Sequence, residues 1–125
     1  MPNPFDSKLL VKTFSVIGSA ALSTTFTPLT TSIELEDIIL STTTVTTNST
    51  LLITITNPSN VSQIFTWYEQ ASMRNIRSIW YAPPIRSIAP KDSIITITWP
   101  NPDNCTFTLL LKYLERYQIQ EMTYA

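Results

Sequence analysis

The side chains best suited to metal or acid–base chemistry in this chain are three neighbouring carboxylates. Glu34, Glu36 and Asp37 occur within the segment SIELEDIIL, residues 32–40. In an extended strand Glu34 and Glu36 point to the same face, where a carboxylate pair could join a calcium site or act as a glycosidase dyad. Because no partner for the pair is visible in the sequence, we interpret it as the solvated face of an outer strand.

Other catalytic chemistry is limited by the residue types that the chain lacks. The 125 residues include no histidine, one glycine (Gly18) and one cysteine (Cys105). Without histidine, neither a Ser–His or Cys–His nucleophile nor the usual zinc sites can be assembled. One glycine leaves no phosphate-binding loop, and one cysteine cannot form an intrachain disulfide. We therefore predict a non-enzymatic protein without cofactors or metals, in which Cys105 is a small buried side chain.

A basic stretch interleaved with aromatic residues is the clearest candidate binding feature. Arg74, Arg77 and Arg86 occur beside Trp80 and Tyr81 with no acidic residue between them. Basic groups beside aromatic rings can bind single-stranded nucleic acid, and they can equally bind an acidic protein or remain solvated. The net charge of −1 argues against nucleic acid, so we predict a protein interface at these five residues.

The tryptophans suggest a different kind of site. Trp67, Trp80 and Trp99 could form a platform for stacking sugars. Aromatic residues at strand spacing more often belong to a core, so carbohydrate binding is kept as an alternative.

The composition indicates a β-protein that buries a core of its own. Hydrophobic residues make up 43% of the chain and charged residues 14%, against roughly 25% charged in an average domain. The β-branched residues Thr (twenty) and Ile (fifteen) are abundant and favour pleated sheet. Turns depend on Pro, Asn and Asp, as in NPSN (57–60), APP (82–84) and NPDN (101–104).

Alternating apolar residues recur at short spacing along the chain. Strands are predicted at 11–18, 20–27, 32–40, 50–57, 62–69, 76–82 and 85–89, followed by a closing pair around 95–99 and 107–113. The NPDN turn lies between the strands of the closing pair, which we predict to be a β-hairpin. We predict an all-β fold, a single-domain antiparallel β-sandwich (Ig-like or jelly-roll) of about 7–9 strands.

Both ends of the chain are predicted to be extended arms outside the sandwich of residues 11–115. Residues 1–10 contain two prolines and no clear periodicity, and residues 116–125 form a tail. Terminal segments that order on a neighbouring subunit are a common means of assembly. Phe5, Tyr117, Ile119 and Tyr124 are the predicted anchors, with frayed termini as the alternative.

One long segment carries no charge. The thirty-one residues from Ile38 to Tyr68 include no Asp, Glu, Lys or Arg. Soluble proteins usually protect strand edges with lysine, proline or inward-pointing charge, and an open uncharged strand promotes aggregation. We predict that copies of the chain or another protein cover part of this segment; the alternative is that its Thr-rich faces remain hydrated.

Four segments follow one another in a recognisable order: FSVIGSAALSTTFTP (14–28), SIELEDIILST (32–42), NSTLLITITNPSN (48–60) and SIWYAPPIRSIAPKDSIITITWPNPDNCTFTLLLKYL (78–114). Over residues 12–115 this order resembles small β-sandwich structural proteins of tailed bacteriophage virions. Such proteins decorate or cement capsid shells, or form accessory parts of neck and tail. The resemblance implies a role in binding and assembly. Such proteins often use glycine in turns where this chain uses Pro and Asn.

The leading hypothesis is therefore a non-enzymatic virion structural protein, assembled in the host cytoplasm. Its expected partners are capsid or tail proteins and further copies of itself. A membrane is not expected, because no apolar run approaches the ~18 residues of a membrane span. Nucleic acid is not expected because of the net charge. A carbohydrate- or cell-surface-binding sandwich and an extracellular filament subunit are the alternatives. N-x-Ser/Thr sequons at Asn48, Asn60 and Asn104 leave the extracellular alternatives open.

Overall fold

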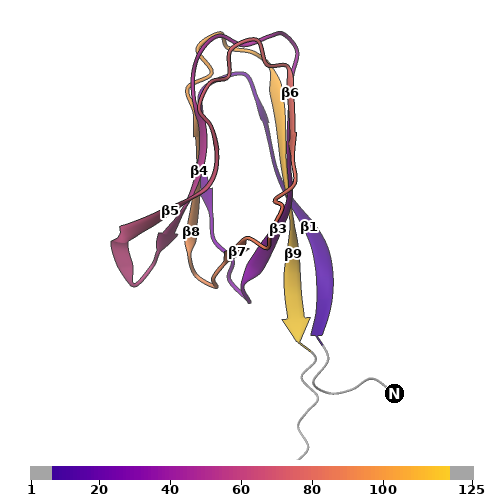
Figure 1. Cartoon of the computed structure of the whole chain (residues 1–125), viewed down its shortest axis with the longest axis vertical. Coiled ribbons are helices and arrows are strands. Elements are labelled where there is room, and N and C mark those ends of the chain that lie inside the picture. The colour runs from indigo at the N-terminus through magenta and orange to yellow at the C-terminus, as the bar shows by residue number, and fades with distance from the viewer. Residues whose placement is uncertain (1–6, 119–125) are drawn as a thin grey trace, which may run out of the picture.

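Two antiparallel sheets face each other across a shared core in the computed structural model, which describes residues 7–118 (Figure 1). Sheet A has the order β1-β9-β3-β6, with β7 also paired to β3, and sheet B has the order β2-β8-β4-β5. The strands are β1 (Ser7–Gly18), β2 (Leu22–Phe26), β3 (Ile33–Thr42), β4 (Leu51–Asn57), β5 (Asn60–Gln70), β6 (Ser78–Tyr81), β7 (Ile88–Ala89), β8 (Ile94–Trp99) and β9 (Phe107–Gln118). The predicted all-β antiparallel sandwich is confirmed.

The core is built from the alternating residues that the sequence pattern identified. Strand β4 buries Leu51, Ile53 and Ile55, and β8 buries every second residue from Ile95 to Trp99. Opposite them, β9 buries alternate residues from Phe107 to Leu111. Each fully buried side chain of this kind stabilises the fold by roughly 1.5–3 kcal/mol. Each long strand therefore contributes one face to the core, whereas the exposed half of β5 contributes neither face.

The closing pair of strands does not form the predicted hairpin. Strand β8 belongs to sheet B and β9 to sheet A, so the chain crosses from one sheet to the other between them. The rings of Trp99 and Phe107 meet edge-on across the core, with centroids 5.5 Å apart. The physical reason is that both strands have an apolar face to bury, and facing each other buries more apolar surface than pairing side by side.

The turn between β8 and β9 is held by a buried asparagine. The side chain of Asn101 donates to the carbonyl groups of Ala20 and Cys105 and accepts from the amide of Cys105, each at 3.0 Å. Asn101 has a positive φ of 44° and Asn104 one of 51°, a conformation that asparagine tolerates better than most residues. Asn101 thus ties the crossing segment to the β1–β2 connection, and Cys105 is buried as predicted.

The strands at the two ends of the chain are longer than predicted. Backbone pairing of β1 with β9 extends to Ser7 and Gln118, so the predicted boundaries are wrong for residues 7–10 and 116–118. Leu9, Leu10 and Val11 are consecutive apolar residues without alternation, which concealed the start of the strand. The predicted anchors Phe5, Ile119 and Tyr124 lie outside the described residues, and Tyr117 is described only by its backbone pairing with Lys8.

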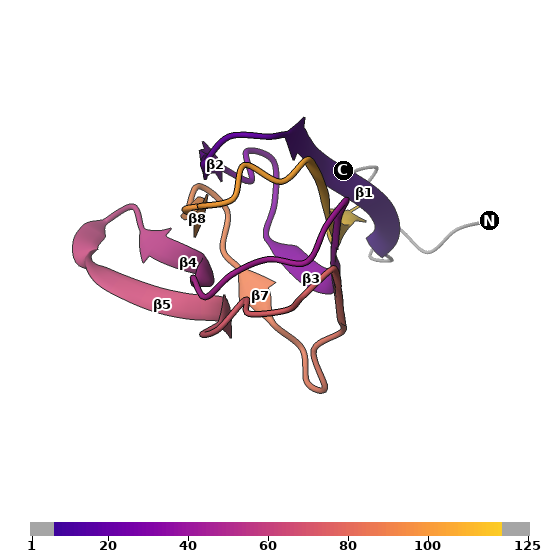
Figure 2. The same cartoon turned by 90° about the horizontal axis from the view of Figure 1, so that it is seen from above.

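The hairpin of β4 and β5 leaves the body of the sandwich. In Figures 1 and 2 its tip projects to one side, away from sheet A. Residues 60–66 of β5 are all exposed. Asn57 and Asn60 fold the tip through their side-chain oxygens, which accept from the amides of Ser59 and Ser62. The predicted strand at 62–69 is therefore present, with one half outside the core.

Replacement of Asn101 tests the role of the crossing turn. Asn101→Ala removes three hydrogen bonds and strains the positive φ, so we expect the free energy of unfolding to fall by about 3 kcal/mol. Asn101→Gly removes the bonds without the strain and should cost about 1 kcal/mol less. Urea unfolding measures both values.

Asn104 provides the matched control, because its φ is also positive but its side chain is exposed. Asn104→Ala should cost about 1 kcal/mol. Equal losses at the two positions would show that the Asn101 hydrogen bonds do not hold the turn.

Candidate interface

The three carboxylates of β3 lie on a bulged part of the strand. A bulge between Leu35 and Asp37 displaces Glu36 from the regular alternation, and Glu34 pairs with Arg86 at 3.1 Å. No group of three or more potential metal-ligating His, Cys, Asp or Glu residues occurs in residues 7–118. Glu36 is exposed, whereas Glu34 and Asp37 are partly buried on β3, which lies between β9 and β6 and is not an outer strand of the sheet.

The structure divides the predicted basic stretch between two ends of the molecule. The Arg77 guanidinium donates to the carbonyl of Thr43 at 3.5 Å, just beyond the end of β3. Arg86 instead pairs with Glu34 near the start of β3. Nine residues of extended chain separate Thr43 from Glu34, about 30 Å. The basic residues therefore do not form one patch along which a nucleic acid strand could lie.

Arg74 and Arg77 lie at the end where the chain passes from β5 to β6. The connecting loop is anchored by Met73, which is fully buried, and by Thr46, whose single hydroxyl hydrogen is shared between the carbonyl oxygens of Met73 and Ile76. Both arginine side chains are exposed. The loop that carries both arginines closes this end of the core, which places them far from Arg86.

The three tryptophans do not form a sugar-binding platform. Trp99 is 1% exposed, and its indole nitrogen donates to the hydroxyl of Ser49 at 2.9 Å. Trp67 is half-buried and packs against the core. Trp80 is 79% exposed, and the ring contacts found among the described residues do not involve it. The three rings considered as an alternative binding platform are therefore not brought together, because strand alternation sends them to different surfaces.

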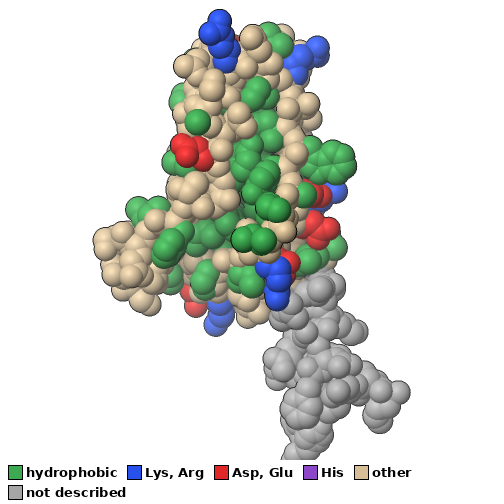
Figure 3. Space-filling view, in the orientation of Figure 1, with side chains coloured by type: hydrophobic (Ala, Val, Ile, Leu, Met, Phe, Trp, Pro, Cys, Tyr) green, Lys and Arg blue, Asp and Glu red, His purple; other side chains and the backbone are tan. Residues whose placement is uncertain are grey.

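Trp80 and Tyr81, adjacent in β6, have opposite environments. Tyr81 turns inward and packs on Tyr68 with ring centroids 4.6 Å apart, which closes the seam between the two sheets. Burial raises the pKa of Tyr68 above its ordinary value, with a smaller electrostatic contribution from the neighbouring Tyr81 ring. Figure 3 shows hydrophobic side chains along this front seam. Of the two aromatic residues in the basic stretch, Trp80 is exposed and Tyr81 is partly buried.

Trp80 belongs to a row of apolar side chains on the outer face of sheet A. The register places Trp80 beside Ile39 of β3, and Ile39 beside Leu110 of β9. Nearer the other end of the sheet, Ile88, Leu114 and Val11 lie along a second row that Glu34 interrupts. We call this surface the Trp80 face: Val11, Ile17, Ile39, Trp80, Ile88, Leu110 and Leu114.

Few charges interrupt the Trp80 face, and opposite charges lie side by side where they occur. Asp37 is opposite Lys112 in the register between the two apolar rows. Arg86 and Glu34 form the salt bridge at the β7 edge. In Figure 3 hydrophobic side chains stand out from the flank where β3 and β6 lie. Exposed apolar surface rimmed by polar groups is typical of protein-binding sites.

The outer face of sheet B has a different character. Its register aligns Thr25, Thr96, Thr54 and Thr66 across the four strands β2, β8, β4 and β5. Threonine hydroxyl groups can exchange hydrogen bonds with water on this face. This threonine row contains no counterpart of the exposed Trp80; the exposed aromatic residue of sheet B, Phe65, lies on the projecting half of β5.

Trp80 is predicted from the sequence as an interface residue, whereas its neighbours on the face are not. Ile39 lies within the apolar run of residues 38–40, and Leu110 within that of residues 109–111. In such runs both faces of the strand are apolar, but the core of a two-sheet sandwich covers only one of them. The other apolar face stays exposed unless another layer covers it. The apolar runs therefore indicated that an apolar face would be exposed, but not which of the two faces it would be.

Comparison with known proteins does not extend these observations. No protein-family model and no curated protein matches the chain. No helix suited to crossing a bilayer occurs in residues 7–118.

The fold should tolerate the loss of Trp80. Because this side chain is 79% exposed, Trp80→Ala is expected to change the free energy of unfolding by less than about 1 kcal/mol. The adjacent Ile79 is 9% exposed, and Ile79→Ala should cost about 2–4 kcal/mol. Urea unfolding of the two variants checks this contrast, and a large loss with Trp80→Ala would show that Trp80 serves the fold.

Proposed function

We propose that the chain is a non-enzymatic virion structural protein that decorates or cements a capsid, or serves as a head–tail accessory, by binding protein subunits. The observation that carries this proposal is the Trp80 face. The context of a tailed-phage particle comes from the resemblance of residues 12–115 to virion β-sandwich proteins.

The exposure of Trp80 favours a binding role over a structural one. A tryptophan buries about 150–250 Å² when it is covered, so leaving it in water forgoes a large stabilisation. Tryptophan is also the residue type most enriched among the few that carry most of the energy of protein–protein binding. Since Trp80 adds little to the fold, contact with a partner gives a physical reason for its place on the surface.

The neighbours of Trp80 favour a protein partner over a sugar or a nucleic acid. Ile39 and Leu110 continue the row as aliphatic side chains. Aliphatic neighbours supply neither stacking rings nor the polar groups that orient a sugar, and the dispersed arginines do not follow a phosphate backbone. Apolar rows with residues of opposite charge between them fit a protein partner, whose own surface mixes apolar and charged groups.

The test requires particles produced by the source of the sequence. Mass spectrometry of purified particles should detect the chain, and particles depleted of it should bind the added wild-type protein in a co-sedimentation assay. Trp80→Ala should weaken this binding by roughly 30-fold, as for an interface residue worth about 2 kcal/mol.

Leu29→Ala is the matched control, because Leu29 is 72% exposed but lies in the β2–β3 connection, outside the Trp80 face. It should bind like the wild type. Absence of the chain from the particles, or full binding by the Trp80→Ala variant, would overturn the proposal. Recovery of Trp80-dependent binding on a polysaccharide instead of on particles would assign the face to carbohydrate.

A further inference from the structure

We infer that the exposed half of β5 is a self-association edge, which pairs antiparallel with β5 of a second copy of this chain. This inference deepens the self-assembly part of the proposed function and assigns it to a surface distinct from the Trp80 face. It concerns residues 60–66, which we call the β5 edge.

The β5 edge is open on one side and on both faces. In the described part of the chain β5 pairs with β4 alone and ends the order of sheet B. Val61, Ile64 and Phe65 are 69%, 57% and 61% exposed. Figure 2 shows the β4–β5 hairpin standing away from the other strands. Apart from the amide of Ser62, which donates to the Asn60 side chain, the free side of β5 therefore offers backbone amide and carbonyl groups together with apolar side chains.

The other sheet edges carry features that oppose pairing with another chain. At one edge of sheet A, β1 contains Lys8 and Lys12. The opposite edge consists of β6 and β7, only four and two residues long, and Pro83, Pro84 and Pro90 lie beside them. At the far edge of sheet B, β2 has five residues. Short strands, lysine, proline and β-bulges are the usual protections of an edge.

Strand β5 lacks most of these protections. It has eleven residues, contains no lysine or proline, and carries its single charge at Glu69, beyond the exposed half. Two register shifts interrupt its pairing with β4, but the segment from Ile64 to Thr66 between them pairs regularly. In Figure 3 the projecting hairpin shows neither basic nor acidic side chains.

The absence of charge favours a second copy as the occupant. Two β5 edges related by a two-fold axis would pair antiparallel without like-charge repulsion. An acidic or basic partner would find no complementary charge there. The antiparallel arrangement also places the same apolar residues of both copies against each other.

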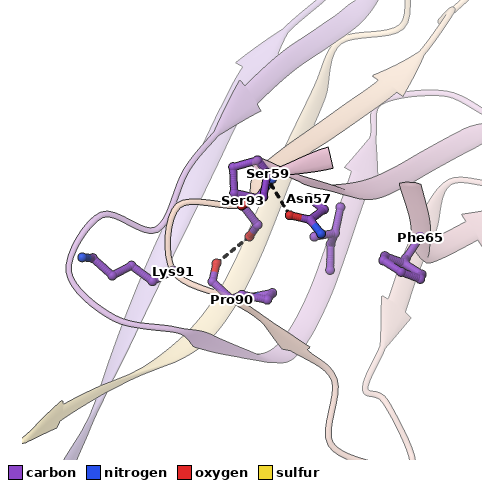
Figure 4. A pocket seen from close by; sticks show the side chains of 8 residues that line it. Asn57, Ser59, Phe65, Pro90, Lys91 and Ser93 are labelled. Atoms are coloured by element: carbon purple, nitrogen blue, oxygen red, sulfur yellow. Dashed lines mark hydrogen bonds between the residues drawn. The ribbon is translucent and has the colours of Figure 1, made fainter. Parts of the chain in front are cut away.

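A hollow beneath the hairpin adds apolar surface to this edge. It has a volume of about 300 Å³, with Ile55 and Phe65 on the hairpin side and Pro90 and Lys91 on the side of the β7–β8 connection. Figure 4 shows Phe65 and Pro90 at opposite sides of this hollow. A side chain from the hairpin of the second copy would find an apolar wall there, next to the paired strands.

The expected contact is small. Only Ile64 to Thr66 pair regularly with β4, and even all seven residues of the β5 edge would span no more than about 23 Å. Such a contact buries less than the roughly 800 Å² per partner of a standard interface. We therefore expect a weak dimer, with a Kd on the order of 100 µM. Such a contact strengthens when many copies are held side by side on another surface.

Sedimentation equilibrium of the purified chain tests the inference. The wild type should show a reversible monomer–dimer equilibrium. Ile64→Lys adds a charge on each copy at the edge and should raise the Kd by at least about tenfold. Leu29→Lys adds the same charge at a similarly exposed apolar position outside the edge and should leave the Kd unchanged. A strictly monomeric wild type, or equal effects of the two lysines, would overturn the inference.

Disulfide trapping tests the antiparallel geometry independently. The native Cys105 is buried, so a cysteine introduced on β5 is the accessible thiol. Near the two-fold axis, the Cα atom of a residue lies about 4.5–5.5 Å from the Cα atom of the same residue in the second copy. This distance suits a disulfide. Of Ser62→Cys, Gln63→Cys and Ile64→Cys, at least one should form a covalent dimer on mild oxidation, whereas Leu29→Cys should not. Failure of all three would contradict the pairing.

These results are separable from the proposed function. Loss of dimerisation with Ile64→Lys in a protein that is absent from particles would support the β5 edge and overturn the virion role. Trp80-dependent particle binding by a wild type that never dimerises would support the virion role and overturn the β5 edge.

Discussion

The shared core fixes which side of every strand faces outward. A strand has only two faces, and the contact between the sheets, exemplified by Trp99 against Phe107, commits one face of each long strand to the interior. The Asn101 turn makes this contact possible because it carries the chain from sheet B to sheet A. Once Leu109 and Leu111 are inside, Leu110 must be outside. The exposed apolar residues are thus a consequence of the same alternation that forms the core.

Two uncovered surfaces follow from this arrangement, and they differ in physical character. The Trp80 face is a side-chain surface, with an aromatic residue at its edge and aliphatic neighbours in register. The β5 edge is mainly a backbone surface, formed where the β4–β5 hairpin leaves the sandwich. The threonine rows of sheet B provide the contrast, since hydroxyl groups remain well hydrated. We propose that partner subunits cover the Trp80 face and the β5 edge, and that the threonine face of sheet B stays in water.

The fold class and most strands could be predicted from the sequence, because alternation is local. The alternate spacing of Leu51, Ile53 and Ile55 is enough to place them on one face of β4. The pairing of strands is not local, which is why β8 and β9 were expected to pair as a hairpin although they lie in opposite sheets. Arg77 and Arg86 likewise appeared close because nine residues separate them in sequence, whereas the path from β6 to β7 takes them to opposite ends of β3. The Trp80 face was predicted only at Trp80, since its partners come from distant strands.

The most direct test of this account is amide hydrogen exchange on the free protein and on the same protein bound to its assembly. The account predicts that new protection appears in β5 and in the strands β3, β6 and β9 beneath the Trp80 face. It also predicts that the exchange of β2 and β8 in sheet B stays unchanged. Protection confined to the threonine face, or no new protection on binding, would contradict the claim that these two surfaces carry the function.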